Sequence, residues 1–155
     1  MKKYIAPVLW IVGFQLVGGG LGFLTSRNIE PWYDGLNKAA LNPPDYVFGL
    51  VWPILYVMLA LTGWLMWRDR RLEGAHMPLN LYWMQMFFNW GWTFIFFEFK
   101  LVLLGFFWIL TLNFTMLCFI IYAWKNHRVA ALLALPTLFW GCFAAYLNYA
   151  IWVLN

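Results

Sequence analysis

The chain has 155 residues, of which 65% are hydrophobic and only 10% charged, and its mean hydropathy is +0.70. Soluble domains carry about 25% charged residues, so this composition excludes an ordinary water-soluble domain. The net charge of +4 comes from basic residues in short segments between apolar runs. This placement favours contact with anionic lipid headgroups and disfavours nucleic acid as a partner.

Five stretches of the chain contain no Asp, Glu, Lys or Arg. They are residues 4–26, 46–67, 77–97, 101–124 and 129–155. Each is long enough to cross a bilayer, because a helix needs about 20 apolar residues to span the hydrocarbon layer. A soluble helical protein would instead show polar faces with a period of 3.6 residues. The sequence therefore predicts an all-α membrane protein, a five-transmembrane-helix bundle, formed by residues 1–155 as a single domain.

The expected helices cover about residues 4–24, 47–67, 79–97, 101–124 and 129–154. The first could be mistaken for a secretory signal, but its apolar run is longer than the 7–15 residues typical of a signal and lacks an Ala-x-Ala site. We interpret it as a retained helix. Gly18 and Gly22 near its end form a G-x-x-x-G face, which favours close packing within the chain or in a homodimer. The glycine run should also loosen this helix end.

The connection at residues 26–46 is the only long one. Long connections in compact domains are usually either functional or disordered. Prolines restrict the backbone of this segment, and its aromatic residues supply apolar area, so we predict an ordered lid over one end of the bundle. The candidate lid residues are Trp32, Tyr33, Lys38, Asn42, Pro43 and Pro44.

The later helices carry two further signals. Pro53 in the second helix cannot donate a backbone hydrogen bond, which should bend the helix or free a carbonyl near Gly49. The third and fourth helices are joined only by residues 98–100. A turn this short makes them antiparallel neighbours.

Basic residues are distributed unequally between the two sides of the predicted bundle. One side holds Lys2, Lys3, Arg68, Arg70, Arg71, Lys125 and Arg128, and the other holds Arg27, Lys38 and Lys100. The positive-inside rule then predicts a cytoplasmic N-terminus and a C-terminus outside.

Amide side chains at membrane depth are candidates for function, because an unpaired amide costs several kcal/mol in hydrocarbon. Gln85 and Asn89 lie four residues apart and share a helix face. Asn148 lies in the fifth helix. For these three, hydrogen bonding between helices and contact with a ligand both stay open. Gln15 and Asn113 are expected to bond between helices.

The chain contains 12 Trp, many near the ends of the spans, where aromatic residues form interfacial belts. Trp52, Trp92 and Trp140 do not fit that position. Aromatic walls with a few amides are typical of a pocket for a flat apolar ligand. The alternative is that these three rings are ordinary core residues.

Several chemistries are not indicated. No Asp or Glu lies inside a span, which argues against a proton relay or carboxylate ion path. His76 and His127 lie in basic loops without metal-ligand spacing, so no metal site and no histidine-ligated haem is predicted. No nucleophile triad, phosphate loop or dinucleotide motif is present. Cys118 and Cys142 fall inside spans and indicate no disulfide.

Four segments resemble the translocator protein family, also called TspO, the tryptophan-rich sensory protein or the peripheral benzodiazepine receptor. Residues 32–44 resemble its W-Y-x-x-L-x-K-P-x-x-x-P-P loop, and residues 51–56 its V-W-x-x-L-Y motif. Residues 85–97 are similar to its Q-x-x-x-N-x-x-W…F-F helix, and residues 136–149 to its P-Y-x-x-W…L-N-Y helix. The matches cover nearly the whole chain in family order.

The resemblance implies a five-helix bundle, often a homodimer, with a pocket closed by the first loop. Family ligands are tetrapyrroles such as protoporphyrin IX, cholesterol and other sterol-like molecules, and benzodiazepine-type or isoquinoline drugs. No covalent cofactor is implied. Motif positions and membrane-depth polar groups together give the candidate ligand-binding residues Trp52, Tyr56, Gln85, Asn89, Trp92, Trp140, Ala144, Leu147 and Asn148.

The sequence departs from the family pattern at three places. Ala39 replaces a lid proline, and Thr137 replaces the tyrosine of the fifth helix. Tyr149 is followed by no basic residue, so the cholesterol-recognition pattern of animal members, weak even when complete, is incomplete. A bacterial member with a porphyrin-like ligand fits this sequence better.

Four functions are compatible with these features. The first is a binding and sensing protein for porphyrins or related apolar molecules. The second is an enzyme that degrades protoporphyrin in light and oxygen, with Trp52 and Trp140 as the only catalytic candidates. The third is a passive transporter of porphyrin or sterol. The fourth is a scaffold that acts through the Gly18 and Gly22 face.

Overall fold

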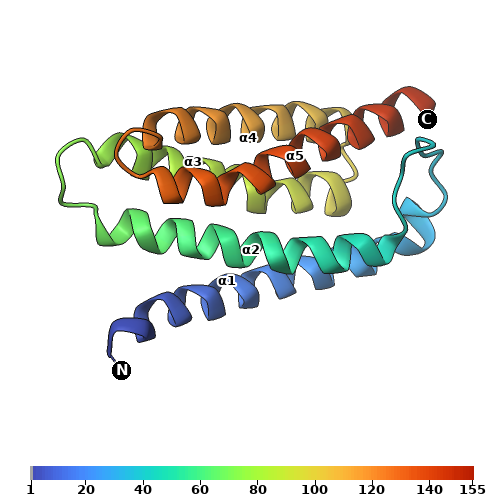
Figure 1. The fold of residues 1–155 in the computed structure, drawn as a ribbon. Helices are drawn as coiled ribbons and strands as arrows, with labels where there is room; N and C mark the ends of the chain where they lie inside the picture. Colours follow the sequence, from blue (N-terminus) through green and yellow to red (C-terminus); the bar gives the residue numbers. More distant parts are fainter. Residues whose placement is uncertain (1) are drawn as a thin grey trace.

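The computed structural model describes the backbone of residues 2–155 and the side chains of residues 4–155. The side chains of Lys2 and Lys3, which enter the charge count above, lie outside the described residues. Five long helices run alongside one another in a single bundle (Figure 1). They are α1 (Lys2–Arg27), α2 (Asp45–Arg68), α3 (His76–Thr93), α4 (Val102–Ala123) and α5 (Arg128–Leu154). The described residues form no strand, and the predicted all-α five-helix bundle is confirmed.

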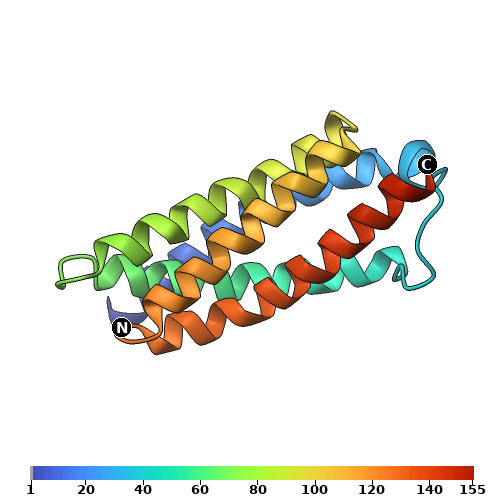
Figure 2. The same ribbon diagram turned by 90° about the horizontal axis from the view of Figure 1, so that it is seen from above.

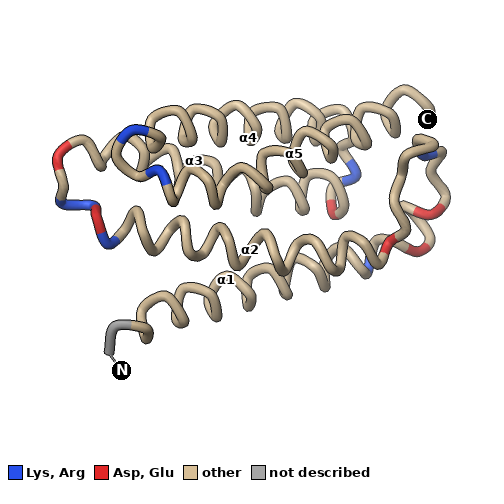
Figure 3. Tube along the Cα trace, viewed as in Figure 1, with Lys and Arg blue, Asp and Glu red and all other residues tan. Residues whose placement is uncertain are grey.

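Four of the five helices, α1, α2, α4 and α5, are long and apolar enough to cross a membrane. Helix α3 is shorter, at 18 residues, but it continues directly into a π-helical turn, η2 (Phe94–Glu98). At a rise of 1.5 Å per residue, the combined segment extends over about 34 Å. Charged residues gather at the two ends of the bundle and are absent from the middle of the described helices (Figure 3). The chain is a multi-pass integral membrane protein.

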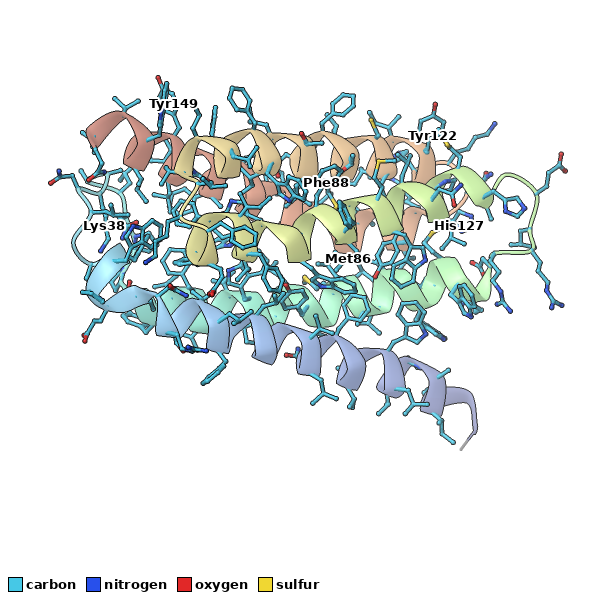
Figure 4. The ribbon with its side chains drawn as sticks, turned by 180° about the vertical axis from the view of Figure 1, so that it is seen from behind. Lys38, Met86, Phe88, Tyr122, His127 and Tyr149 are labelled. Carbon is cyan, nitrogen blue, oxygen red and sulfur yellow. The ribbon has the colours of Figure 1, made fainter. Side chains whose placement is uncertain are left out.

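The helices pack in the order α1, α2, α5, α4, α3, with extensive contact between successive members, and Figure 2 shows the same bundle from above. Large buried side chains such as Tyr82, Met86 and Phe119 fill the main core. In Figure 4, Met86 points into the bundle, whereas Tyr122 and Tyr149 point away from it. These two tyrosines are about half exposed, as expected for side chains that face lipid or the interface.

Helix α1 differs from its expected end. It stays helical through the whole glycine run and ends at Arg27, because packing against α2 outweighs the weak helix propensity of glycine. A Cβ at Gly18 would lie 2.6 Å from the ring of Tyr56. Close packing within the chain therefore explains Gly18, and dimerisation stays a prediction.

Pro53 does not break α2, which continues from Asp45 to Arg68. The side chain of Gln15 on α1 donates a hydrogen bond of 2.8 Å to the Pro53 carbonyl. The predicted inter-helix bond of Gln15 is thus confirmed. It stabilises α1 against α2 at the level where the proline interrupts the backbone ladder.

The short turn between α3 and α4 places these helices next to each other, as predicted. The backbone N–H of Phe99 donates to the Phe94 carbonyl at 2.8 Å, and Lys100 takes a left-handed φ of 57°. Farther along, the indole N–H of Trp108 donates to the Phe88 carbonyl at 2.8 Å. The two helices are therefore joined by a side chain as well as by the turn.

At the other end of the bundle, Asp69 follows α2 and accepts two hydrogen bonds from Arg68, at 2.6 and 2.9 Å. These bonds hold the pKa of Asp69 below its ordinary value, and the charge of His127 acts in the same direction. Nδ1 of His127 lies 3.5 Å from the Asp69 carboxylate. The contact links the end of α2 to the α4–α5 turn.

We expect Gly63→Ala to destabilise the bundle. A Cβ at Gly63 would overlap the hydroxyl of Tyr82 and lie 2.6 Å from the ring of Trp10, and Tyr82 donates from this hydroxyl to the Leu59 carbonyl at 2.9 Å. Overpacking of this kind costs about 1–3 kcal/mol, measurable as a lower unfolding temperature in detergent. Gly13→Ala is the control, because its Cβ would meet nothing within 4 Å. Equal unfolding temperatures for the two variants would contradict this packing.

Candidate ligand-binding cavity

A cavity of about 370 Å³ lies between α1, α2, α5 and the loop that follows α1. This volume falls within the range of small-molecule sites. The lining is mainly apolar and aromatic. The residues that line it from α2 and α5 include Trp52, Pro53, Tyr56, Trp140, Ala144, Leu147, Asn148 and Ile151.

Helix α1 contributes three glycines to the cavity wall, Gly18, Gly19 and Gly22, beside side chains such as Gln15 and Leu21. A Cβ at Gly19 or Gly22 would meet nothing within 4 Å. The space beside these two residues is therefore created by missing side chains, and a larger residue would extend into it.

Three tryptophans border the cavity. Trp52 packs against Tyr56 with ring centroids 5.7 Å apart. Trp140 packs edge-on against Phe48 at 5.8 Å. Trp92 stacks on Phe96 at 4.9 Å with an interplanar angle of 14°. Indoles from α2, α3 and α5 thus contribute aromatic surface to one space.

Asn148 lines the cavity, and both the oxygen and the nitrogen of its side-chain amide form hydrogen bonds. Its Oδ1 accepts a hydrogen bond of 3.3 Å from the indole N–H of Trp92. Its Nδ2 donates to the Val102 carbonyl at 2.8 Å. Both bonds run between helices, so Asn148 positions Trp92 and joins α5 to α4.

Gln85 and Asn89, which we predicted as ligand contacts, do not line the cavity. Asn89 lies behind the wall and accepts a hydrogen bond of 3.0 Å from the Tyr56 hydroxyl. Gln85 is completely buried, and its amide has no hydrogen-bond partner among the described residues. The helix face shared by these residues turns toward the core of the bundle.

Among the candidate lid residues, only Tyr33 lines the cavity. It is buried, and its hydroxyl donates to Oδ1 of Asn42 at 3.1 Å. Burial raises the pKa of Tyr33 to about 12, with a further contribution from the charge of Asp45. The phenol therefore stays protonated near neutral pH and acts as a donor.

The other candidate lid residues support the loop from outside the cavity. Trp32 packs edge-on against Phe96 at 5.5 Å, and Nζ of Lys38, labelled in Figure 4, lies 4.3 Å from the Tyr33 ring centroid. Pro43 and Pro44 lead into the first residue of α2. The segment is ordered by these contacts and lies over the cavity end of the bundle (Figure 1).

The loop is also attached to the end of the chain. The backbone N–H of Asn37 donates to Oδ1 of Asn155 at 2.9 Å, and Nδ2 of Asn155 donates to the Asn37 carbonyl at 3.0 Å. Nδ2 of Asn37 reaches the Leu154 carbonyl at 3.3 Å. This exchange fastens the loop to α5, which also forms one wall of the cavity.

Sequence reasoning missed several residues of the lining. Gln15 and the α1 glycines were interpreted as structural, and Phe48 and Asp45 were not among the candidates. The glycine run was the available signal for the wall, since small residues mark a close approach. No local pattern indicated the role of Asp45.

The described residues contain no group of three or more His, Cys, Asp or Glu side chains able to hold a metal ion. Several buried polar groups besides Gln85 have no partner among the described residues, including Nδ2 of Asn89, the indole N–H of Trp140 and the hydroxyl of Thr137. Of these, Trp140 borders the cavity. The site offers aromatic surface and isolated hydrogen-bond donors.

Residues 8–153 match the TspO/MBR family. The chain belongs to this family. It is 35% identical to the translocator protein of Sus scrofa, over 94% of this chain and 90% of that protein. It is also 34% identical to the tryptophan-rich sensory protein of Cereibacter sphaeroides, over 81% and 78%. The tryptophan-rich protein TspO of Archaeoglobus fulgidus is 29% identical over 99% and 97%. The TspO/MBR resemblance inferred from the motifs is thus confirmed.

We expect Gln85 and Asn148 to respond differently to apolar substitution. Gln85→Met removes a buried amide that has no partner among the described residues, so stability should stay equal or rise. Asn148→Leu leaves the Trp92 indole without its acceptor and should cost about 1–3 kcal/mol. Thermal unfolding in detergent compares the two. A loss of stability in Gln85→Met as large as in Asn148→Leu would show that Gln85 is paired.

Proposed function

We propose that this TspO/MBR protein binds a planar, largely apolar ligand of the tetrapyrrole class, such as protoporphyrin IX, in the cavity between α1, α2 and α5. The observation that carries the proposal is the convergence of Trp52, Trp92 and Trp140 on one space of about 370 Å³. Flat aromatic molecules gain dispersion and stacking energy against such walls. Sterol-like molecules are the alternative ligand class.

The proposed contacts follow from the lining. Trp52 and Trp140 would contact the faces or edges of the ligand, with Ala144 and Leu147 completing the apolar surface. The indole N–H of Trp140 is buried and has no partner among the described residues. A ligand in the cavity would therefore contact the aromatic surface of Trp140 and not its N–H.

We propose a sensing or regulatory role coupled to the loop. Tyr33 belongs to the loop and lines the cavity, while Asn37 ties the same loop to Asn155. A ligand that contacts Tyr33 can therefore change the position of an exposed segment. Such coupling needs a ligand that interacts differently with the two loop positions.

Filling the cavity tests the site. Gly22→Leu places a side chain in space that is open beside the cavity wall and should weaken protoporphyrin IX binding tenfold or more. Gly20→Leu is the matched control, because Gly20 is equally uncrowded but does not line the cavity. Titration followed by tryptophan quenching measures both affinities. Equal affinities for the two variants would reject this cavity as the site.

We also propose that the N-terminus is cytoplasmic and the C-terminus outside. The end of the bundle with Arg68, Arg70, Arg71, Lys125 and Arg128 is the more basic one (Figure 3), which the positive-inside rule places in the cytoplasm. In intact cells, an impermeant thiol reagent should label Asp34→Cys and spare Glu73→Cys, both made without the two native cysteines. The reverse labelling would invert this orientation.

A further inference from the structure

The two ends of the bundle differ in charge, and the cavity lies toward the acidic one, where the loop and the first residue of α2 contribute to its lining. The acidic residues at the cavity end are Glu30, Asp34, Asp45 and Glu98, and the basic ones are Arg27, Lys38 and Lys100. This end therefore carries a net charge of −1, while the basic residues dominate the opposite end (Figure 3). A ligand that enters the cavity from this end meets an acidic surface first.

Asp45 is the one charged side chain among the described residues that line the cavity. It is the first residue of α2, and it is exposed. No described basic group lies within 4 Å of its carboxylate. Its charge also contributes to the raised pKa of Tyr33, which agrees with a carboxylate on the same side of the cavity as that hydroxyl.

The basic side chains of this end are engaged elsewhere. Nζ of Lys38 lies 3.3 Å from Asp34 and 4.3 Å from the Tyr33 ring centroid. Nζ of Lys100 lies 5.7 Å from the ring centroid of Trp32. Neither lysine lines the cavity, and neither does Arg27. A ligand carboxylate inside the cavity would find no cationic partner among the described lining residues.

We propose that Asp45 makes the cavity charge-selective, so that it favours planar ligands with a neutral or cationic edge over ligands with carboxylates. The proposal rests on the proposed function and specifies the chemistry of the ligand. A ligand carboxylate within the apolar walls would lose its hydration without compensation. Near the mouth it would be repelled by the like charge of Asp45. A cationic or hydrogen-bond-donating edge would instead be attracted to this carboxylate.

For a porphyrin with two carboxylate groups, the selectivity has a geometric consequence. The apolar face of the ring enters between Trp52 and Trp140, and the carboxylates stay in water outside the mouth. Esterification removes the repulsion without changing the ring. The dimethyl ester of protoporphyrin IX is therefore the better ligand for the wild-type cavity.

The test compares protoporphyrin IX and its dimethyl ester on the wild type and on Asp45→Asn, in one detergent. Asp45→Asn should strengthen binding of the free acid about 1.5- to fivefold, the range expected for one exposed charge pair. It should leave ester binding unchanged, and Asp45→Lys should strengthen acid binding further. Comparing the acid-to-ester affinity ratio between variants cancels the difference in partition of the two porphyrins into detergent.

Asp34→Asn is the matched control. Asp34 belongs to the same acidic end but is paired with Lys38 and does not line the cavity, so its substitution should leave the acid-to-ester ratio at the wild-type value. A ratio that is the same in the wild type, Asp45→Asn and Asp45→Lys, with both porphyrins bound, would overturn the charge selectivity and leave the proposed function intact. Saturable binding of neither porphyrin by the wild type would overturn both.

Discussion

Gly18 of α1 lies directly against the ring of Tyr56 on α2, at a distance that leaves no room for a Cβ. This contact fixes the separation of the two helices and holds one face of the tyrosine ring. From the other side, the Tyr56 hydroxyl donates to Asn89 of α3, and its ring packs against Trp52. Three helices therefore meet at a single side chain at the cavity wall. Near this contact, Gly19 and Gly22 line the cavity without side chains. The space beside them is open because these two residues have no Cβ.

Polar side chains in the bundle divide into two groups with different consequences. Gln15 bonds the Pro53 carbonyl, and Asn148 bonds Trp92 and α4, so these amides stabilise contacts between helices. Gln85 and the indole of Trp140 have no partner among the described residues. Such groups are costly in hydrocarbon. Gln85 lies in the core of the bundle, whereas the ring of Trp140 borders the cavity although its N–H is buried.

The loop after α1 and the end of α5 form one structural unit. Asn37 and Asn155 exchange two hydrogen bonds, and Tyr33 of the same loop lines the cavity. Asn155 directly follows α5, the helix that contributes Ala144 and Leu147, among others, to the cavity wall. Any movement of the loop must therefore break polar contacts at the exposed end of α5. The position of the Tyr33 ring in the cavity wall and the position of the loop are therefore coupled.

The sequence by itself determined the spans and their order, because charge-free runs of about 20 residues satisfy their backbone in hydrocarbon only as helices. It also marked Trp52, Trp92 and Trp140 as unusual, since aromatic residues away from span ends need another environment than the interfacial belt. Which residues line the same cavity was decided only by the tertiary structure. Gln85 and Asn89 occupy a single helix face, yet that face turns toward the core, because its direction depends on how α2 and α4 pack against α3. Asp45 borders the cavity because the loop after α1 returns the chain to the cavity end of the bundle. This is a long-range arrangement that no local sequence pattern encodes.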